Sequence, residues 1–456
     1  MSAIPGGLDT DQQPPMTVPL RHFVVGFGFF LGGGVLGSAS TLVLVPGLVT
    51  LAHVHLLLAG WVCLTIMGAM TQFVPVWSGV ELHSQWFAVV QLWLVTIGLV
   101  GFVAMLLVGN LRWLPLFGAI MLVGFWVFVY NIGRTLGTAR PFDVTERHFA
   151  LALGFFSLLT VLGLLLALDF TYPVFAPLSI SRGRIVMTHA TLAVFGAVLT
   201  TILGALYQLA TMFTQTSLHG IDVHLRRIEE VAYPVGVVAL ALGRLLTIRS
   251  IAQVGGLLII VSLLGFSIIL ARRLHETQVE WTPMLSRYTV VVPAMVLWAI
   301  LTAPAWLVNP LARSSLFGAP GAVHLLVLGI IGFVVLGTLY HIVPFIIWVH
   351  RYSDLLGFEK VPMIDDLYNA HIAIVDFVAV VAGTVVIVLA EWFALPRIVF
   401  AAGGLSVLIG FCLFVVNMLL VIRNHSPHGL RGIFVSKVAA SEQRRSSGPQ
   451  EPPSER

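Results

Sequence analysis

The amino-acid sequence predicts an all-α integral membrane protein with twelve transmembrane helices arranged as three four-helix repeats. Three observations lead to this prediction: a very apolar composition, a series of long apolar runs, and motifs that recur at fixed offsets in different runs. Of the 456 residues, 58% are hydrophobic and 10% are charged, and the mean hydropathy is +0.99. Soluble globular chains carry about 25% charged residues, so this chain is expected to reside in a lipid bilayer.

The rest of the composition excludes several other classes of protein. The formal net charge of +4 is small, and we expect no nucleic-acid partner. Cys63 and Cys412 lie in apolar runs and match no zinc or redox spacing, which argues against a disulfide framework. The polar, proline-rich N-terminus is no signal peptide. We therefore expect disordered tails at 1–20 and 426–456 around a membrane domain at 21–425.

Apolar runs of about 20 residues are long enough to cross a bilayer as helices. Twelve such runs follow one another along the chain, with short polar connections between them. They cover residues 22–47, 51–77, 86–107, 113–134, 149–170, 184–213, 228–247, 251–271, 288–307, 321–349, 367–389 and 397–422.

The distribution of basic residues predicts the orientation in the membrane. An even number of spans places both termini on one side. On that side fall 17 of the 24 lysines and arginines, and basic loops stay in the cytoplasm. Both termini are therefore predicted to be cytoplasmic in a multi-pass protein of the plasma or inner membrane, surrounded by lipid.

One motif relates the second, sixth and tenth predicted spans. The second and tenth share a histidine followed by glycine at +5 and +13, a polar residue at +17 and proline at +20. The residues are His55, Gly60, Gly68, Gln72 and Pro75 in one and His324, Gly329, Gly337, His341 and Pro344 in the other. The sixth span has a weaker copy, in which Gly204 aligns with Gly68, Gln208 with Gln72 and His189 with His53.

A second motif relates the fourth, eighth and twelfth spans. The fourth and twelfth have two glycines, two phenylalanines and an asparagine at identical offsets, and the eighth keeps one glycine and one phenylalanine. The residues are Gly118, Gly124, Phe125, Phe128 and Asn131; Gly404, Gly410, Phe411, Phe414 and Asn417; and Gly265 and Phe266. Two motifs in a common period predict repeats at about 21–140, 141–275 and 285–425.

His53 and His55 raise the question of why one membrane helix carries two imidazoles. At about 100° per residue they lie roughly 200° apart around the helix, so they cannot readily bind the same metal ion. They could serve two cofactors, or one could be a ligand while the other makes a structural hydrogen bond. His189 and His324 are predicted at a similar depth, and imidazole is a good ligand for iron and copper. The simpler alternative is hydrogen bonding between helices.

Three further polar residues inside predicted spans are candidates for a functional role. His341 lies about 25 Å from His324 by helical rise, too far to share its site. It is a candidate for a second site, for a proton relay, or for an interhelical bond. His371 and Asp376 on the eleventh span could form part of a proton path, because intramembrane ionisable groups are costly and usually functional. A buried polar pair is the alternative.

These motifs resemble those of the heme-copper oxidase subunit I superfamily, which includes respiratory nitric oxide reductases. The stretch "HVHLLLAGWVCLTIMGAMTQFVP" is similar to the tenth helix of the C-type oxidases, and "VHLLVLGIIGFVVLGTLYHIVP" is similar to that same helix. Continued through "VWSG", the first stretch also resembles the H-x-H…P-x-W-[ST]-G segment of NnrS-like proteins. The resemblance spans most of residues 20–425, with its specific motifs on the second and tenth spans.

The resemblance implies cofactors and residue roles. His55 and His324 match the two axial ligands of a low-spin heme b, with His53 as a further cofactor-binding candidate. His189 matches a ligand of copper or non-heme iron in catalytic members. The match is incomplete, because Ala322 stands where those members have a second histidine and the seventh span has no histidine pair.

The predicted function follows from this partial match. It is a heme-binding membrane protein with an incomplete binuclear centre, acting in electron transfer or in nitric oxide or oxygen chemistry. A divergent catalytic oxidase or nitric oxide reductase subunit is one alternative, and a transporter with structural histidines is another. A quinone or a cytochrome would supply electrons, and partner subunits are expected.

Overall fold

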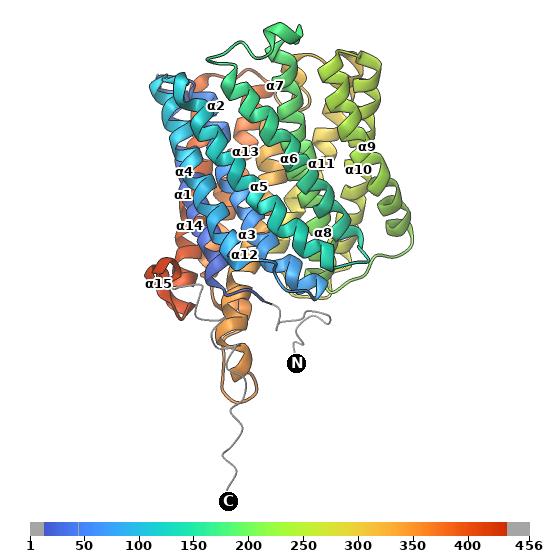
Figure 1. Ribbon diagram of the computed structural model, residues 1–456. Helices are drawn as coiled ribbons and strands as arrows, with labels where there is room; N and C mark the ends of the chain where they lie inside the picture. Colours follow the sequence, from blue (N-terminus) through green and yellow to red (C-terminus); the bar gives the residue numbers. More distant parts are fainter. Residues whose placement is uncertain (1–12, 44, 436–456) are drawn as a thin grey trace, which may run out of the picture.

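The structure is a computed structural model of the chain that describes residues 13–43 and 45–435, and it is a bundle of long helices (Figure 1). Eleven helices are long and apolar enough to cross a membrane, which confirms the prediction of an all-α, multi-pass membrane protein. They are α1 (Thr17–Leu42), α2–α3 (Val49–Ser78), α4 (Gln85–Val108), α5 with its first turn (Leu111–Thr138), α6 (Val144–Leu168), α7–α8 (Arg182–Thr214), α10 (Arg249–His275), α11 (Pro283–Val308), α12 with its first turns (Leu325–Arg351), α13 (Ala370–Trp392) and α14 (Arg397–His425).

A further long helix, α9 (Ile221–Leu246), stands where the seventh span was predicted at 228–247. It begins earlier than the apolar run and includes charged residues at both ends. These are Asp222, Arg226, Arg227, Glu229, Glu230 and Arg244. Because of these charges α9 is not among the eleven apolar helices. It packs along α10 and α7 within the bundle.

The predicted tails are partly helical. Residues 17–20 belong to α1, where a proline is tolerated in the first turn because its missing N–H has no intrahelical role there. A short helix, α15 (Gly429–Val435), follows α14 and packs against α1, and Ile433 is fully buried. Burial of apolar side chains thus extends the ordered structure at both ends. The remaining tail residues, 1–12 and 436–456, lie outside the described residues.

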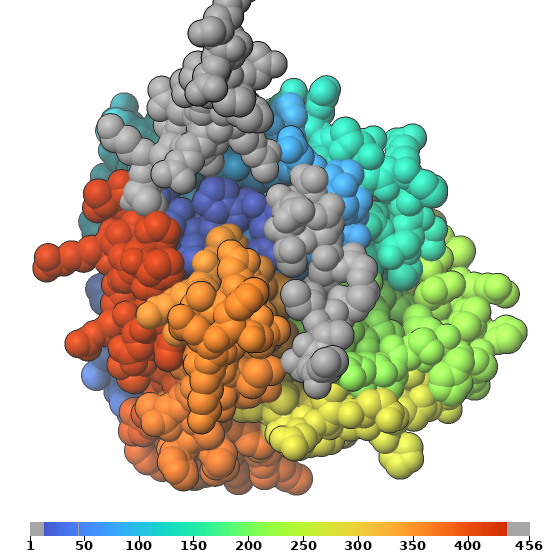
Figure 2. All heavy atoms as spheres, turned by 90° about the horizontal axis from the view of Figure 1, so that it is seen from below, coloured from blue at the N-terminus to red at the C-terminus, as the bar shows by residue number. Residues whose placement is uncertain are grey.

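The outer helices form a closed ring around the most enclosed ones. Viewed from the end that carries α15, the elements follow one another around the molecule in sequence order, from α1 in dark blue to α14 and α15 in red (Figure 2). α1 packs against α14, which closes the ring. The helices Arg182–Thr214 and Leu325–Arg351 are the most enclosed, with 83% of their most apolar stretch buried. Together with α3 they form the centre of the bundle.

Three helices change their winding at corresponding places. π-helical segments cover Leu56–Val62, Leu192–Leu199 and Leu325–Gly332, each beginning within three residues of a predicted ligand histidine. A π-helical segment widens the helix and is frequent at functional sites. The sequence motif gave no indication of this local geometry.

The motif glycines have a steric role. Gly68, Gly204 and Gly337 lie against the first helix of their segment, at His22, His148 and Arg287. A Cβ atom added at these glycines would approach the Cβ atoms of those residues to 2.8, 2.5 and 3.1 Å, respectively. Small residues let membrane helices approach closely, so these glycines set helix spacing.

Each motif asparagine bonds to the loop that leads into the helix preceding its own in the chain. Asn131 Oδ1 accepts a hydrogen bond from the backbone N–H of Ser84, and its Nδ2 donates to the Ser84 carbonyl, both at 2.9 Å. Asn417 makes the same pair of 2.9 Å bonds with Asn369. Ser84 and Asn369 are the N-cap residues of α4 and α13. The second motif therefore has a structural function.

Candidate functional site: a histidine cavity

One face of α2 (Val49–His55) opens on a large cavity that contains two histidines. The cavity has about 940 Å³ of free space and is walled by α2, α4, α5, α6 and the start of the α7–α8 helix. His55 and His189 both line it, and their imidazoles are within electrostatic range of each other. We call it the histidine cavity.

Backbone carbonyls fix the orientation of both rings. His55 Nδ1 is 2.8 Å from the Leu51 carbonyl oxygen, and His189 Nδ1 is 2.9 Å from that of Leu159. A carbonyl can only accept, so each Nδ1 donates and the neutral tautomer leaves a lone pair on Nε2. This arrangement, with the second ring nitrogen held by a carbonyl, is usual for metal-ligating histidines.

The remaining walls of the histidine cavity are apolar and include several small residues. Aromatic rings come from α4, α5, α6 and the loop before α12, namely Phe102, Phe125, Phe156 and Phe317. Small residues are Ala59, Gly118, Gly163, Ala190 and Ala193. A Cβ atom on Gly163 would lie 3.1 Å from Cε1 of His189, so this glycine leaves room for the ring. Thr160 and Cys63 add a hydroxyl and a thiol, and these mainly apolar walls suit a large apolar group.

The opposite face of α2 holds a second pair. His53 Nδ1 is 2.8 Å from the Gly33 carbonyl oxygen, and the ring is within electrostatic range of His324. His324 Nδ1 is 2.8 Å from Oε1 of Glu391, and its ring stands edge-on to Phe400 at 5.5 Å. The other carboxylate oxygen of Glu391 is buried and has no hydrogen-bond partner in the part of the chain that the structure describes.

The four histidines therefore form two pairs, one on each face of α2. His55 shares the histidine cavity with His189, and His53 is within electrostatic range of His324. His324 does not line the histidine cavity, and its Nδ1 bonds to Glu391 on α13. Whether any of these residues binds a heme or a metal remains a prediction.

The deeper candidates lie elsewhere. His341 packs between Phe213 and Phe345, with ring centroids 4.0 and 5.9 Å away. His371 is exposed near the start of α13, whereas Asp376 is buried and forms an ion pair with Arg287. The partner of Asp376 is thus an arginine on α11 rather than His371. Asp376 also accepts a hydrogen bond from the Tyr340 hydroxyl, and the proton path stays a prediction.

One buried cluster, around Glu229, is not among the candidate residues that the sequence predicts. Because α9 begins at Ile221, Glu229 lies two turns inside the helix and is 1% exposed. Its carboxylate is 3.1 Å from Nε2 of His148 and accepts a 2.8 Å hydrogen bond from Tyr207. The period of polar residues in α9 was the available signal, since Asp222 and Glu229 lie seven residues apart on one face.

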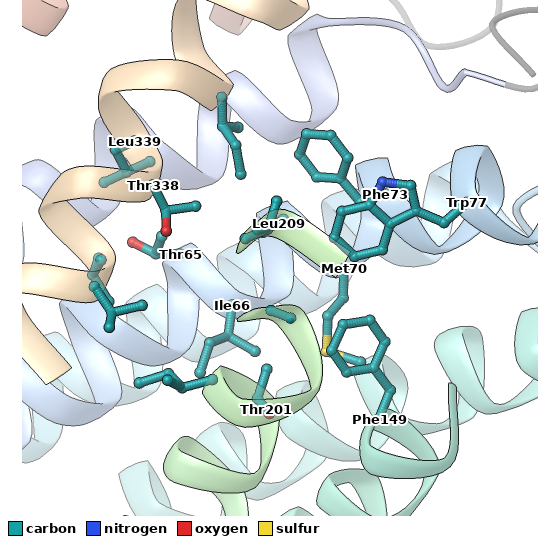
Figure 3. Close-up of a pocket in the computed structure, with 16 residues that line it drawn as sticks. Thr65, Ile66, Met70, Phe73, Trp77, Phe149, Thr201, Leu209, Thr338 and Leu339 are labelled. Carbon is teal, nitrogen blue, oxygen red and sulfur yellow. The ribbon is translucent and has the colours of Figure 1, made fainter. Parts of the chain in front are cut away.

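A second, apolar cavity lies at the centre of the bundle (Figure 3). It has about 600 Å³ of free space and is lined mainly by α3 (Cys63–Ser78), α8 (Thr200–Thr214) and α12 (Phe333–Arg351). Thr65 and Thr338 bring hydroxyl groups to it (Figure 3), and the Thr65 hydroxyl has no partner among the described residues. No histidine lines this central cavity.

Within residues 13–43 and 45–435, no three His, Cys, Asp or Glu side chains group as a metal site. Two imidazoles in a large apolar cavity suit a heme, because the porphyrin supplies the other iron ligands. Comparison with protein-family models gives no match, and comparison with curated proteins gives none either. The chemical interpretation thus rests on this chain's own residues.

Proposed function

We propose that this protein binds a heme b group in the histidine cavity, where His55 and His189 would hold it. One observation carries the proposal: two imidazoles, each held at Nδ1 by a carbonyl, line a mainly apolar cavity with about 940 Å³ of non-atom space, its open side included. The residues fit the group because the cavity offers two imidazoles and mainly apolar walls.

The residues of the cavity would control access and orientation. The Leu51 and Leu159 carbonyls keep the Nε2 lone pairs available by holding the proton on Nδ1. The mainly apolar walls favour a flat, largely apolar group over a hydrated ion. A bound heme would supply one-electron transfer.

We also propose that the membrane domain has twelve spans in three repeats, with α9 as the seventh span. Three observations support the repeats. The π-helical segments stand at corresponding places, the motif glycines contact the first helix of their segment, and Asn131 and Asn417 make matching hydrogen bonds. The buried partners of Glu229 reduce the cost of placing α9 in a membrane. The basic residues favour cytoplasmic termini in the plasma or inner membrane.

The proposed role is electron transfer, or nitric oxide or oxygen chemistry, with a quinone or cytochrome as the electron donor. The pair of His53 and His324 favours a second candidate, a divergent oxidase or nitric oxide reductase subunit with copper, non-heme iron or another heme on that face. Glu391 supports it by bonding His324 at 2.8 Å. A carboxylate in that position raises the basicity of a ligand imidazole.

Absorption spectra of the protein purified in detergent, oxidised and then reduced, test the heme. We expect a Soret band with sharp reduced α and β bands, lost in His55→Ala and kept in His371→Ala, the control with an exposed histidine. A colourless wild type after expression with ample heme would refute the proposal. A high-spin spectrum that changes with carbon monoxide would favour the second candidate.

A further inference from the structure

Three arginines converge on a separate pocket at the end of the bundle where α7 (Arg182–Thr191) begins. This arginine pocket has about 660 Å³ of free space and is lined by Arg184, by Arg244 near the end of α9, and by Arg313 in the loop before α12. Ser181 and Thr247 add hydroxyl groups. None of the lining side chains is acidic.

Arg244 is a buried cation whose hydrogen-bond acceptors among the described residues are neutral oxygens. It is 2% exposed. Its Nε donates to the Pro310 carbonyl at 3.1 Å, one terminal nitrogen to Thr191 Oγ1 at 2.6 Å, and the other to the Ser315 carbonyl at 3.0 Å. A guanidinium has five N–H groups, so one N–H on each terminal nitrogen remains for a ligand.

Nearby carboxylates do not balance this charge. In the described connections at this end, and in the helix turns beside them, the acidic residues are Asp169 and Glu391. Asp169 is paired with Arg182 at 2.8 Å, and Glu391 with His324 at 2.8 Å. A buried charge is costly unless it is paired, so an anion from outside the chain would compensate Arg244.

We propose that the arginine pocket binds an oxyanion of the phosphate class, either free phosphate or the phosphate of a lipid headgroup. The paired N–H groups of Arg244 match two oxygens of such a group, while Arg184 and Arg313 add positive charge at the opening. The site is independent of the proposed heme. Thr191, which accepts a hydrogen bond from Arg244, lies two residues after His189 on α7.

Phosphate titration of the full-length protein in detergent tests this proposal, with sodium chloride at equal ionic strength as reference. Calorimetric binding and the unfolding temperature are the readouts. We expect a phosphate-specific response that weakens roughly tenfold or more in Arg184→Gln and in Arg313→Gln. Arg112→Gln, at an exposed arginine outside the pocket, should respond as wild type does.

A second arm distinguishes the two sources of phosphate. Nanodiscs of phosphatidylglycerol and of phosphatidylcholine are compared by the unfolding temperature of the same variants. A response to free phosphate supports a free anion. A response confined to phosphatidylglycerol and lost in Arg184→Gln supports a lipid headgroup. No response in either arm, or an equal response in wild type and Arg184→Gln, would overturn the proposal.

Discussion

The two faces of α2 differ in what stands opposite each histidine. On one face His55 and His189 border about 940 Å³ of free space, and each ring is held by a backbone carbonyl. On the other, a Cβ atom on Gly37 would lie 2.5 Å from His53 Cε1, and His324 is held by the Glu391 carboxylate. The first face offers room and neutral rings, whereas the second offers close packing against α1 and a charge. A shared sequence motif therefore does not imply a shared role.

The largest expected effect is the difference in heme content between histidine variants on the two faces of α2. His189→Ala is expected to abolish heme binding, because it removes one of the two lone pairs in the histidine cavity. His324→Ala and His53→Ala should keep the bound heme. Heme-to-protein stoichiometry of the purified variants checks this expectation. Loss of heme in His324→Ala with retention in His189→Ala would reverse the comparison between the two faces.

Filling the histidine cavity should also remove the heme while keeping its ligands. Ala193→Trp places a large ring in the cavity, so we expect at least a tenfold loss of bound heme with His55 and His189 intact. Val254→Trp, at an exposed position on α10, is the matched control. Unchanged heme content in Ala193→Trp would mean that the cavity is not where the group binds.

A change on the packed face should affect stability rather than heme binding. Gly37→Val would force His53 to move, and overpacking of this kind costs about 1–3 kcal/mol. The unfolding temperature in detergent should fall, while the heme content of the folded fraction stays constant. A matching fall in heme content would show that the packed face also holds a cofactor.

The smallest effect is expected at the carboxylate of the second pair. Glu391→Gln keeps a hydrogen-bond acceptor for His324 and removes the charge. The two side chains are 19% and 25% exposed, and partly exposed ion pairs contribute about 1 kcal/mol or less. A small shift in unfolding temperature is expected. A large spectral change instead would identify His324 as a ligand.

Local patterns in the sequence predicted much of the bundle. Apolar runs of sufficient length fix helices because backbone groups in lipid must bond within their own segment, and eleven such helices are present. The 200° separation of His53 and His55 follows from helix geometry alone, and their rings do serve opposite faces. The limits of α9 were missed because its first turns are charged, so no apolar run marks where the helix starts.

What the sequence by itself determined is the apolar helical bundle and the histidines that it carries to opposite faces of α2. Only the tertiary structure decided which histidines line the same cavity. The spacing of residues along a helix predicts the direction and depth of their side chains. The neighbours of those side chains depend on how helices from distant segments pack. His55 and His189 line one cavity whose walls also come from α4, α5 and α6, and Asp376 meets Arg287 because α11 lies beside α13. The buried Arg244 and its pocket likewise arise only where α7, α9 and the loop before α12 come together.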